Sequence, residues 1–366
     1  MFNEINTDLE LVHYPFPSIG QFANTIYNIN HKAHYVGQDE DNEPIYDKCL
    51  PMPTLKFVGT TKLHGTNAGI IIDFAKEIVY FQSRENIISP MKDNAGCASF
   101  LASIQKDIVN MVKSNLDITA IDWTKNVLGI YGEWCGGSIQ KGVALNQLEK
   151  MFVIFAIATI NTETKQKTWF IKEVVEEYKL TDKKVFNIFD YKTYEIEIDF
   201  EKHYESTNKL VEMTIEVEDM CPFSKAFGVE GIGEGIVFQC VTAPYSGDSG
   251  FWFKSKGEKH SKSKVKVVRQ VDNEKIEKLL ILADKLTPSW RLEQMLNNTF
   301  DFMNGGQLTR TKMGDYMKAV NNDICKEEMQ TIVDSGIEFK DIANYVGKIS
   351  RDYFFQMEKE MLNTPL

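Results

Sequence analysis

The region from residue 55 to about residue 268 is a succession of short runs of β-forming residues, and this pattern limits the possible folds more than any other feature. We predict strands at 55–59, 68–72, 76–82, 127–133, 151–160, 167–171, 211–217, 235–241 and 250–256. A helix is expected at 99–114, where apolar residues recur at helical spacing. Strands with interspersed helices predict an α+β domain built on antiparallel sheet.

The two ends of the chain differ from this central region. The first fifty residues hold several prolines and an acidic cluster, Asp39-Glu40-Asp41, and read as turns and short elements. After Asp272, a suitable N-cap, apolar residues share helix faces over 276–283 and again over 342–353. We therefore predict an N-terminal extension at 1–50, an α+β domain at 51–268 and a small all-α domain at 269–366.

Composition and charge exclude several classes of protein. Of the 366 residues 43% are hydrophobic and 25% charged, as in globular proteins rather than disordered or collagen-like chains. The six cysteines form no Cys-x-x-Cys pair, so neither a zinc site nor a disulfide framework is expected. A net charge of −11 argues against a surface coated with positive charge for duplex binding, although a local basic groove remains compatible with it.

The sequence shows no sign of membrane association. The longest apolar run, 151–160, is too short to cross a bilayer, and the N-terminal residues lack the basic and apolar regions of a signal peptide. Scattered cysteines also fit a reducing compartment. We expect a cytoplasmic monomer.

A lysine lies at the turn between the first two predicted strands. The hexapeptide Lys62-Leu63-His64-Gly65-Thr66-Asn67 presents this lysine beside a glycine-opened turn, where it can face a pocket. Most lysines beside a turn are solvated, so the hexapeptide alone is weak evidence of chemistry. Downstream residues strengthen it: Lys254 and Lys256 lie on the same face of a predicted strand, can hold a phosphate, and would help Lys62 to lose its proton.

Further candidates stand at the ends of apolar strands. Glu234 precedes a buried strand and could bind Mg²⁺ or meet a lysine, and Glu133 could accept hydrogen bonds from ribose. Phe155 could stack on a base, and Arg84 could contact a phosphate. An exposed position on an edge strand is the more common explanation for a glutamate such as Glu133. Core packing would explain Phe155 equally well, and Arg84 could have no particular role. The basic stripe Lys259, Lys262, Lys264, Lys266 and Arg269 could likewise be a solvated linker.

No standard nucleotide-binding loop is present. The glycines near residue 231 do not follow the Gly-x-Gly-x-x-Gly spacing, and the phosphate-loop pattern Gly-x-x-x-x-Gly-Lys-Ser/Thr does not occur. Any nucleotide is therefore held in another way.

Taken in order, these segments resemble the nucleotidyl-transferring ligases, a superfamily of polynucleotide ligases and mRNA-capping enzymes. The hexapeptide at 62–67 is similar to the nucleophile motif of the branch typified by bacteriophage RNA ligase 2 and the kinetoplastid RNA-editing ligases. His64 marks that branch, because DNA ligases and capping enzymes usually carry aspartate there. The resemblance continues through Arg84, Tyr131-Gly132-Glu133-Trp134, Phe155, Glu234-Gly235-Ile236-Val237 and Lys254-Ser255-Lys256.

The resemblance implies a fold, a function and roles for residues. It implies an antiparallel-sheet ligase adenylation domain with a helical C-terminal domain, and an ATP-dependent RNA ligase that joins 3′-hydroxyl and 5′-phosphate ends through lysyl–AMP and AMP-capped RNA. Its cofactors would be ATP and Mg²⁺ or Mn²⁺, and its partner RNA, as in nick sealing or RNA repair in a bacteriophage. It assigns catalysis to Lys62, His64, Lys254 and Lys256, nucleotide binding to Thr61, Lys62, Asn67, Arg84, Glu133, Phe155, Lys254 and Lys256, and a metal contact to Glu234.

Three positions depart from the pattern of these relatives. Ala156 replaces an acidic residue after the stacking aromatic, Gln239 replaces a lysine that often closes the fourth motif, and Thr61 stands where an acidic residue can help to read adenine. Two alternative functions remain open at this stage. One is an ATP-dependent DNA ligase or GTP-using capping guanylyltransferase, against which His64 argues, and the other is a non-catalytic ligase-like RNA-binding protein.

Overall fold

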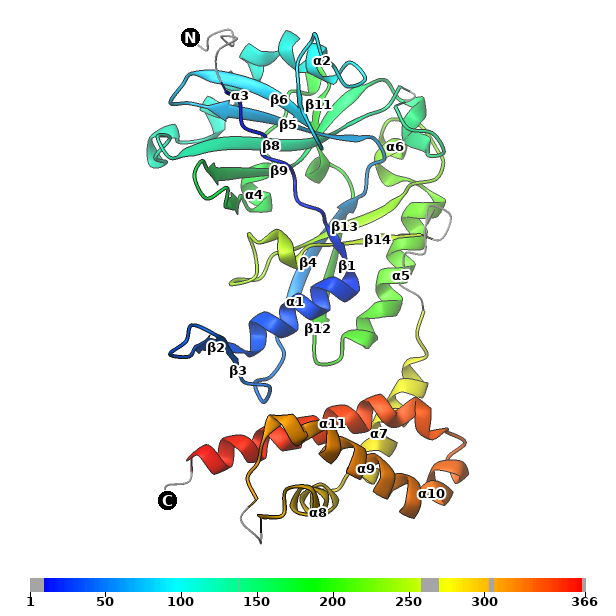
Figure 1. Cartoon of the computed structure of the whole chain (residues 1–366). Coiled ribbons are helices and arrows are strands. Elements are labelled where there is room, and N and C mark those ends of the chain that lie inside the picture. Colours follow the sequence, from blue (N-terminus) through cyan, green and yellow to red (C-terminus); the bar gives the residue numbers. More distant parts are fainter. Residues whose placement is uncertain (1–9, 138, 258–269, 303–305, 364–366) are drawn as a thin grey trace. The chain divides into compact units, whose positions relative to one another are not determined.

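The computed structural model describes residues 10–137, 139–257, 270–302 and 306–363. The chain divides into two compact units, Met1–Ile29 with Thr54–Arg269 and Asn30–Pro53 with Gln270–Leu366 (Figure 1). Residues 30–53 thus group with the helical C-terminal residues rather than with the rest of the first fifty. The domain limits inferred from the sequence remain a prediction.

Two sheets form the larger unit. One has the strand order β1 (Gly20–Gln21), β14 (Phe253–Lys256), β13 (Gly235–Cys240), β4 (Thr54–Thr61), β12 (Thr193–Asp199). The other runs β10 (Lys167–Trp169), β9 (Met151–Asn161), β8 (Asn126–Cys135), β5 (Thr66–Asp73), β6 (Ile78–Ser83), β7 (Ile87–Ile88), with β11 (Val185–Asn187) also paired to β9. Neighbouring strands are antiparallel except for the pairs β1–β14 and β11–β9.

Both faces of the larger sheet are covered, which explains why its strands are apolar throughout. Helices α2 (Cys97–Ser103) and α3 (Gln105–Asn115) bury the face that bears Ile70 and Ile72. The opposite face, which bears Ile71 and Tyr80, packs against Tyr14 and Trp252. Tyr14, which belongs to the predicted N-terminal extension, is therefore part of the core.

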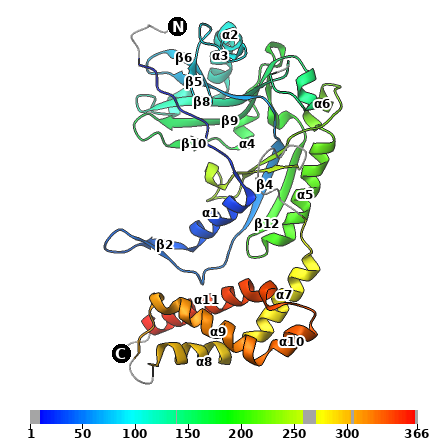
Figure 2. The same ribbon diagram turned by 45° about the vertical axis from the view of Figure 1, so that its right-hand side comes forward.

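Helices α1 (Phe22–His34) and α5 (His203–Asp219) lie beside the five-stranded sheet (Figures 1 and 2). The Phe22 ring lies 5.0 Å from the Phe253 ring, and the Thr214 hydroxyl lies 2.6 Å from that of Ser255. Since alternate residues of a strand face opposite sides, Lys254 and Lys256 lie on the other face of the sheet. The short helices α4 (Lys172–Val175) and α6 (Pro222–Ala226) complete this unit.

The α+β fold is confirmed, with three corrections in the elements. The predicted strand 211–217 is wrong, because these residues lie in α5, whose buried positions Leu210, Val211, Thr214 and Val217 have helical spacing. The helix predicted at 99–114 is two helices, α2 and α3, separated at Ile104, which lies outside the helical conformation. The turns expected in the first fifty residues include a 13-residue helix, α1.

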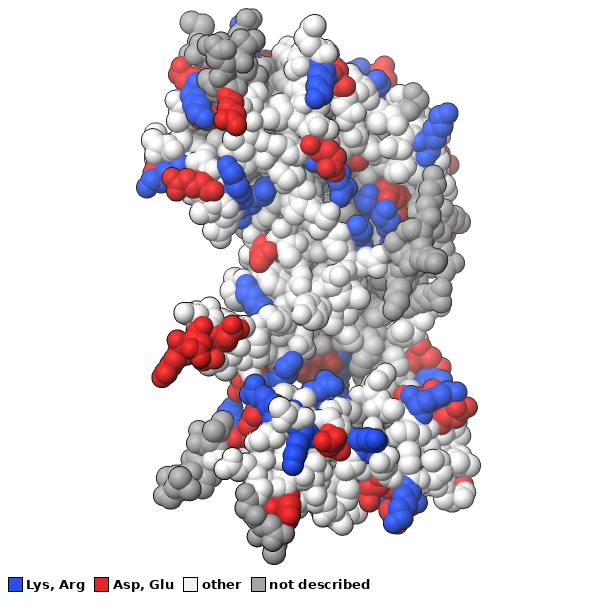
Figure 3. All heavy atoms as spheres, in the orientation of Figure 1, with Lys and Arg blue, Asp and Glu red and all other residues white. Residues whose placement is uncertain are grey.

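The second unit combines helices with a hairpin. Its helices are α7 (Asn273–Leu286), α8 (Ser289–Phe300), α9 (Met313–Glu327), α10 (Met329–Asp334) and α11 (Phe339–Asn363), and its hairpin is β2 (Tyr35–Gln38) with β3 (Pro44–Tyr46). The Lys359 ammonium of α11 lies 2.8 Å from the Asp47 carboxylate, just after the hairpin. Acidic side chains gather on the hairpin turn (Figure 3), where Asp39, Glu40 and Asp41 are exposed in the predicted loop.

Among the described residues, no helix is both long enough and apolar enough to cross a bilayer.

The predicted N-cap of α7 is present and gives a test of the helical unit. The Asp272 carboxylate accepts a hydrogen bond of 2.9 Å from the Lys275 backbone N–H. Asp272→Ala should lower the free energy of unfolding by about 1 kcal/mol, because a helix-end donor loses its acceptor. Urea titration followed by circular dichroism measures this, with exposed Glu277→Ala as a control within the same helix. Equal effects of the two substitutions would contradict a capping role.

Candidate active site

The register of three strands brings the predicted basic and acidic residues together. In the pairing of β4 with β13, Thr61 lies opposite Ile236, and the next residue, Lys62, donates its backbone N–H to the Gly235 carbonyl at 2.8 Å. In the pairing of β13 with β14, Gly235 lies opposite Lys256. Residues far apart in the sequence therefore meet where these strands begin or end.

The Glu234 carboxylate lies at the centre of this cluster. One of its oxygens is 2.7 Å from the Lys62 ammonium and 3.2 Å from the His64 ring, and the other is 2.6 Å from the Lys256 ammonium. The side chain of Glu234 is 5% exposed, against 23% for Lys62 and 29% for Lys256. Burial would raise the pKa of this carboxyl, but the hydrogen bonds and positive charge of its neighbours hold the pKa well below its usual range.

Glycine at position 235 permits this arrangement. Its φ of +145° is one that side chains of L-residues rarely adopt, and a Cβ there would lie 2.1 Å from the Ser255 carbonyl oxygen. The backbone of Glu234 can therefore approach β14 closely enough for its carboxylate to reach both lysines.

The loop between β4 and β5 carries His64 and is held by Glu133. The Gly65 backbone N–H donates to the Glu133 carboxylate at 2.8 Å. Burial raises the pKa of Glu133 to about 7, and the opposing effects of the Lys62 charge and the Gly65 hydrogen bond do not cancel this increase. Glu133 is half-buried rather than an exposed edge residue.

Phe155 lies at a β-bulge in the larger sheet. Tyr131 pairs with Ala156 and Gly132 with Ile154, so Phe155 is the extra residue of β9 and has no partner in β8. A bulge changes the direction in which a side chain points, and Phe155 is partly exposed in a strand that is otherwise largely buried. Its carbonyl accepts a hydrogen bond of 3.4 Å from the Gln239 amide.

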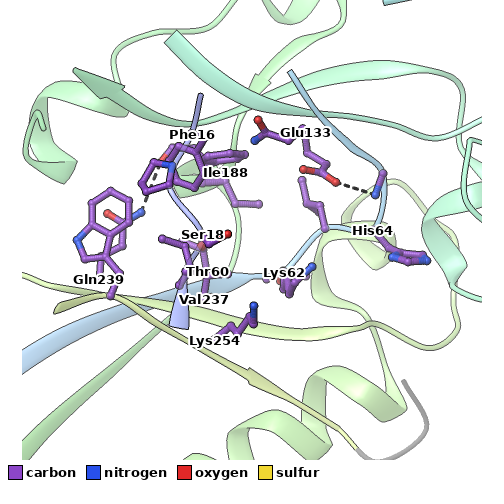
Figure 4. A pocket seen from close by; sticks show the side chains of 18 of the residues that line it. Phe16, Ser18, Thr60, Lys62, His64, Glu133, Ile188, Val237, Gln239 and Lys254 are labelled. Carbon is purple, nitrogen blue, oxygen red and sulfur yellow. Dashed lines mark hydrogen bonds between the residues drawn. The ribbon is translucent and has the colours of Figure 1, made fainter. Parts of the chain in front are cut away.

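A pocket of about 330 Å³ connects these groups (Figure 4). It falls in the size range of small-molecule sites, about 300–1,000 Å³. Eight of the ten predicted site residues line it: Thr61, Lys62, His64, Asn67, Arg84, Glu133, Phe155 and Lys254. The other two, Glu234 and Lys256, contact Lys62 directly or through the shared carboxylate. The structure thus brings all ten together.

The phosphate-binding candidates differ in their surroundings. Burial lowers the pKa of the Lys254 ammonium, and the neighbouring charges of Lys256 and Lys62 lower it further. Arg84 is exposed and donates a hydrogen bond of 2.9 Å to the Ser18 hydroxyl. The buried Thr61 hydroxyl has no hydrogen-bond partner among the described residues.

Part of the pocket wall comes from the N-terminal segment, for which no role in a site is predicted from the sequence. Phe16, Pro17, Ser18 and Ile19 all line the pocket, as do Ile188 and Trp252. The available signal was an aromatic pair, Tyr14 and Phe16, within a proline-rich stretch that was interpreted as turns. The predicted basic stripe, Lys259 to Arg269, lies outside the described residues.

A divalent metal fits this site only if most of its ligands come from a bound phosphate and water rather than from protein side chains. No group of three or more His, Cys, Asp or Glu residues within the described ranges could hold a metal. Glu234 can supply one carboxylate oxygen if it exchanges a lysine contact, and Mg²⁺ commonly takes its remaining ligands from phosphates and water. The donor set is therefore compatible with a metal that arrives with a phosphorylated ligand.

Comparison with known proteins gives one match to a family. The sequence model for RNA ligase matches residues 55–256, more than half of the chain. No match was found among curated proteins.

Solved structures with a similar fold include RNA ligases of Naegleria gruberi. A mutant of that enzyme with ATP and Mn has 16% identity and a TM-score of 0.41, over 68% of this chain and 58% of that one. The same enzyme with PPi has 18% identity and a TM-score of 0.39, over 71% and 62%. The chain thus spans about three fifths of that enzyme's length.

Glu133 provides a test of the site through pH. Because its folded-state pKa is about 7 against an ordinary 4.5, the folded chain keeps a proton that the unfolded chain releases between these values. Glu133 should therefore make stability fall as pH rises from about 4.5 to 7. Glu133→Gln keeps the acceptor for the Gly65 N–H. It should reduce the difference in unfolding free energy between pH 4.5 and pH 7.5 by on the order of 1–3 kcal/mol. Urea titrations of both proteins at pH 4.5 and 7.5 measure it, and parallel stability curves would contradict the assignment.

Proposed function

Since this chain belongs to the RNA ligase family, we propose that it is an ATP-dependent RNA ligase that works through a covalent lysyl–AMP intermediate. One observation carries the proposal: the Lys62 amine lies at the wall of the pocket, within a cluster of cations arranged around Glu234. A nucleophilic lysine surrounded by phosphate-binding cations suits attack on a nucleotide phosphate.

In the first step the Lys62 amine attacks the α-phosphorus of ATP. A nitrogen–phosphorus bond forms, the bond to the bridging α–β oxygen breaks, pyrophosphate leaves with that electron pair, and the amine loses its proton. The amine needs its lone pair, so the ion pair of 2.7 Å between Lys62 and Glu234 must open before attack. The arriving phosphates favour this opening, because they compete with Glu234 for the same cations.

Lys254 and Lys256 hold the phosphates during this step. Phosphoryl transfer depends mainly on positioning and on neutralisation of charge, which two lysines on one strand face can provide. Mg²⁺ or Mn²⁺, placed by Glu234, would add neutralisation of the leaving pyrophosphate. Glu133 would bind the ribose, and Phe155 would stack on the adenine.

The later steps use RNA ends. The 5′-phosphate of an RNA attacks the lysyl–AMP phosphorus, which frees Lys62 and forms AMP-capped RNA. A 3′-hydroxyl then attacks the RNA 5′-phosphorus, which forms the phosphodiester and releases AMP. His64, Asn67 and Arg84 line the same pocket and can contact these groups. We infer that the protein acts in nick sealing or RNA repair. We further infer that a phage encodes it and that it works in the cytoplasm of the host cell.

Substitution of Lys62 tests the first step. Lys62→Ala should abolish transfer of label from α-labelled ATP to the denatured chain, because the attacking nitrogen is absent. Lys56→Ala is the matched control, since Lys56 lies in β4, the strand that leads to Lys62, with a side chain that is 72% exposed, and it should label normally. GTP run in parallel tests the capping alternative. Label on Lys62→Ala would overturn the assignment of the nucleophile.

Substitution of Arg84 tests the later steps. Arg84→Ala should slow sealing of a nicked RNA duplex by about tenfold or more, as expected for loss of a hydrogen bond to a charged phosphate, while labelling with ATP stays within about threefold. Gel analysis of AMP-capped and sealed RNA from preformed enzyme–AMP measures it. Lys92→Ala, at another exposed position, is the control. Equal losses in both steps would assign Arg84 to the ATP site instead.

A further inference from the structure

The segment from Tyr14 to Gln21 crosses from one sheet of the larger unit to the other, and we call it the N-terminal strap. At its start, the Tyr14 carbonyl accepts hydrogen bonds from the Gln82 amide at 2.6 Å and the Tyr131 hydroxyl at 2.7 Å. At its end, β1 pairs with β14, with Gln21 opposite Lys254. The strap is thus fixed to the larger sheet at one end and beside a phosphate-binding lysine at the other.

Phe16 lies between these two anchors, within a group of aromatic rings. Its ring centroid is 5.4 Å from those of Tyr131 and Trp169, and 5.0 Å from that of Phe155. Both Phe16 and Phe155 line the pocket, and Figure 4 shows Phe16 on the opposite side from His64. The aromatic end of the pocket, with Phe16 and Phe155, is therefore separate from the end that carries His64.

The two rings form a corner. Their planes are inclined by 71°, so a flat base that stacked on Phe155 beside Phe16 would present an edge to the Phe16 ring. An apolar ring accepts a C–H edge at little cost, whereas a polar amino group placed against it loses its hydrogen bonds to water without a replacement. At C2 adenine carries a hydrogen where guanine carries an amino group, so a base whose C2 edge faces Phe16 would be distinguished in favour of adenine.

We propose that Phe16 is a specificity-determining residue that closes the base end of the pocket and favours adenine over guanine. The strap lies outside the region matched by the RNA ligase family, residues 55–256, so this contact is supplied by a segment beyond the shared motifs. The inference rests on the proposed function for the identity of the ligand, a purine nucleoside triphosphate.

Nucleotide binding tests this proposal separately from catalysis. In a Lys62→Ala background, in which no adduct forms, calorimetric titration with ATP and with GTP gives dissociation constants for Phe16→Ala, Phe16→Leu and the parent protein. Phe16→Ala should weaken ATP binding about tenfold and reduce the preference for ATP over GTP, while Phe16→Leu, which keeps an apolar wall, should stay within about threefold.

Leu11→Ala is the matched control for packing. Leu11 packs on the same core cluster as Phe16 but does not line the pocket. It should lower the melting temperature without changing the ATP to GTP preference. If Phe16→Ala leaves ATP affinity unchanged, or lowers ATP and GTP affinity equally, Phe16 has only a packing role and the inference is overturned.

The same measurements distinguish failure of the inference from failure of the proposed function. If the Phe16 variants change nucleotide binding as expected but the wild-type chain never acquires label from ATP, the ligase chemistry is refuted and the base contact is supported. A wild-type chain that acquires label while Phe16→Ala retains the parent's nucleotide preference would refute the base contact alone.

Discussion

One carboxylate shared by three basic side chains organises this site. Glu234 contacts Lys62, His64 and Lys256, and its position follows from the register of β4, β13 and β14 and from the unusual backbone of Gly235. Without the buried carboxylate, two ammonium groups would repel one another across a short distance. Glu234 therefore holds the ammonium groups of Lys62 and Lys256 in place, and a site that is ordered in this way loses less free energy when it binds a ligand.

The charged half of the site could be predicted from the sequence because its residues stand at the ends of apolar strands. Alternation along a strand places Lys254 and Lys256 on one face, and the structure confirms this because Phe253 and Ser255 are buried on the other. The sequence could not show that Glu234 meets both Lys62 and Lys256. That contact depends on strand order and register, which no local pattern contains.

The aromatic residues of the site, Phe155 and Phe16, could not be predicted with the same arguments. Phe155 reads as an ordinary core residue, and only the bulge in β9 directs it to the pocket. Phe16 lies in a proline-rich segment whose long-range contacts leave no periodic signal. The misassigned strand at 211–217 has a related cause, since β-branched residues there suggested a strand, while the wider spacing of buried positions in α5 is helical.

The pairing of β1 with β14 determines what happens when this chain is shortened to its ligase motifs. A fragment cut to residues 55–256 would keep every ligase motif, yet it would turn β14 into an edge strand with unpaired backbone N–H and C=O groups. Such an edge is a template for joining another chain. Self-association would then begin beside Lys254, so a fragment that carries the complete set of motifs would aggregate through the strand that bears Lys254 and Lys256.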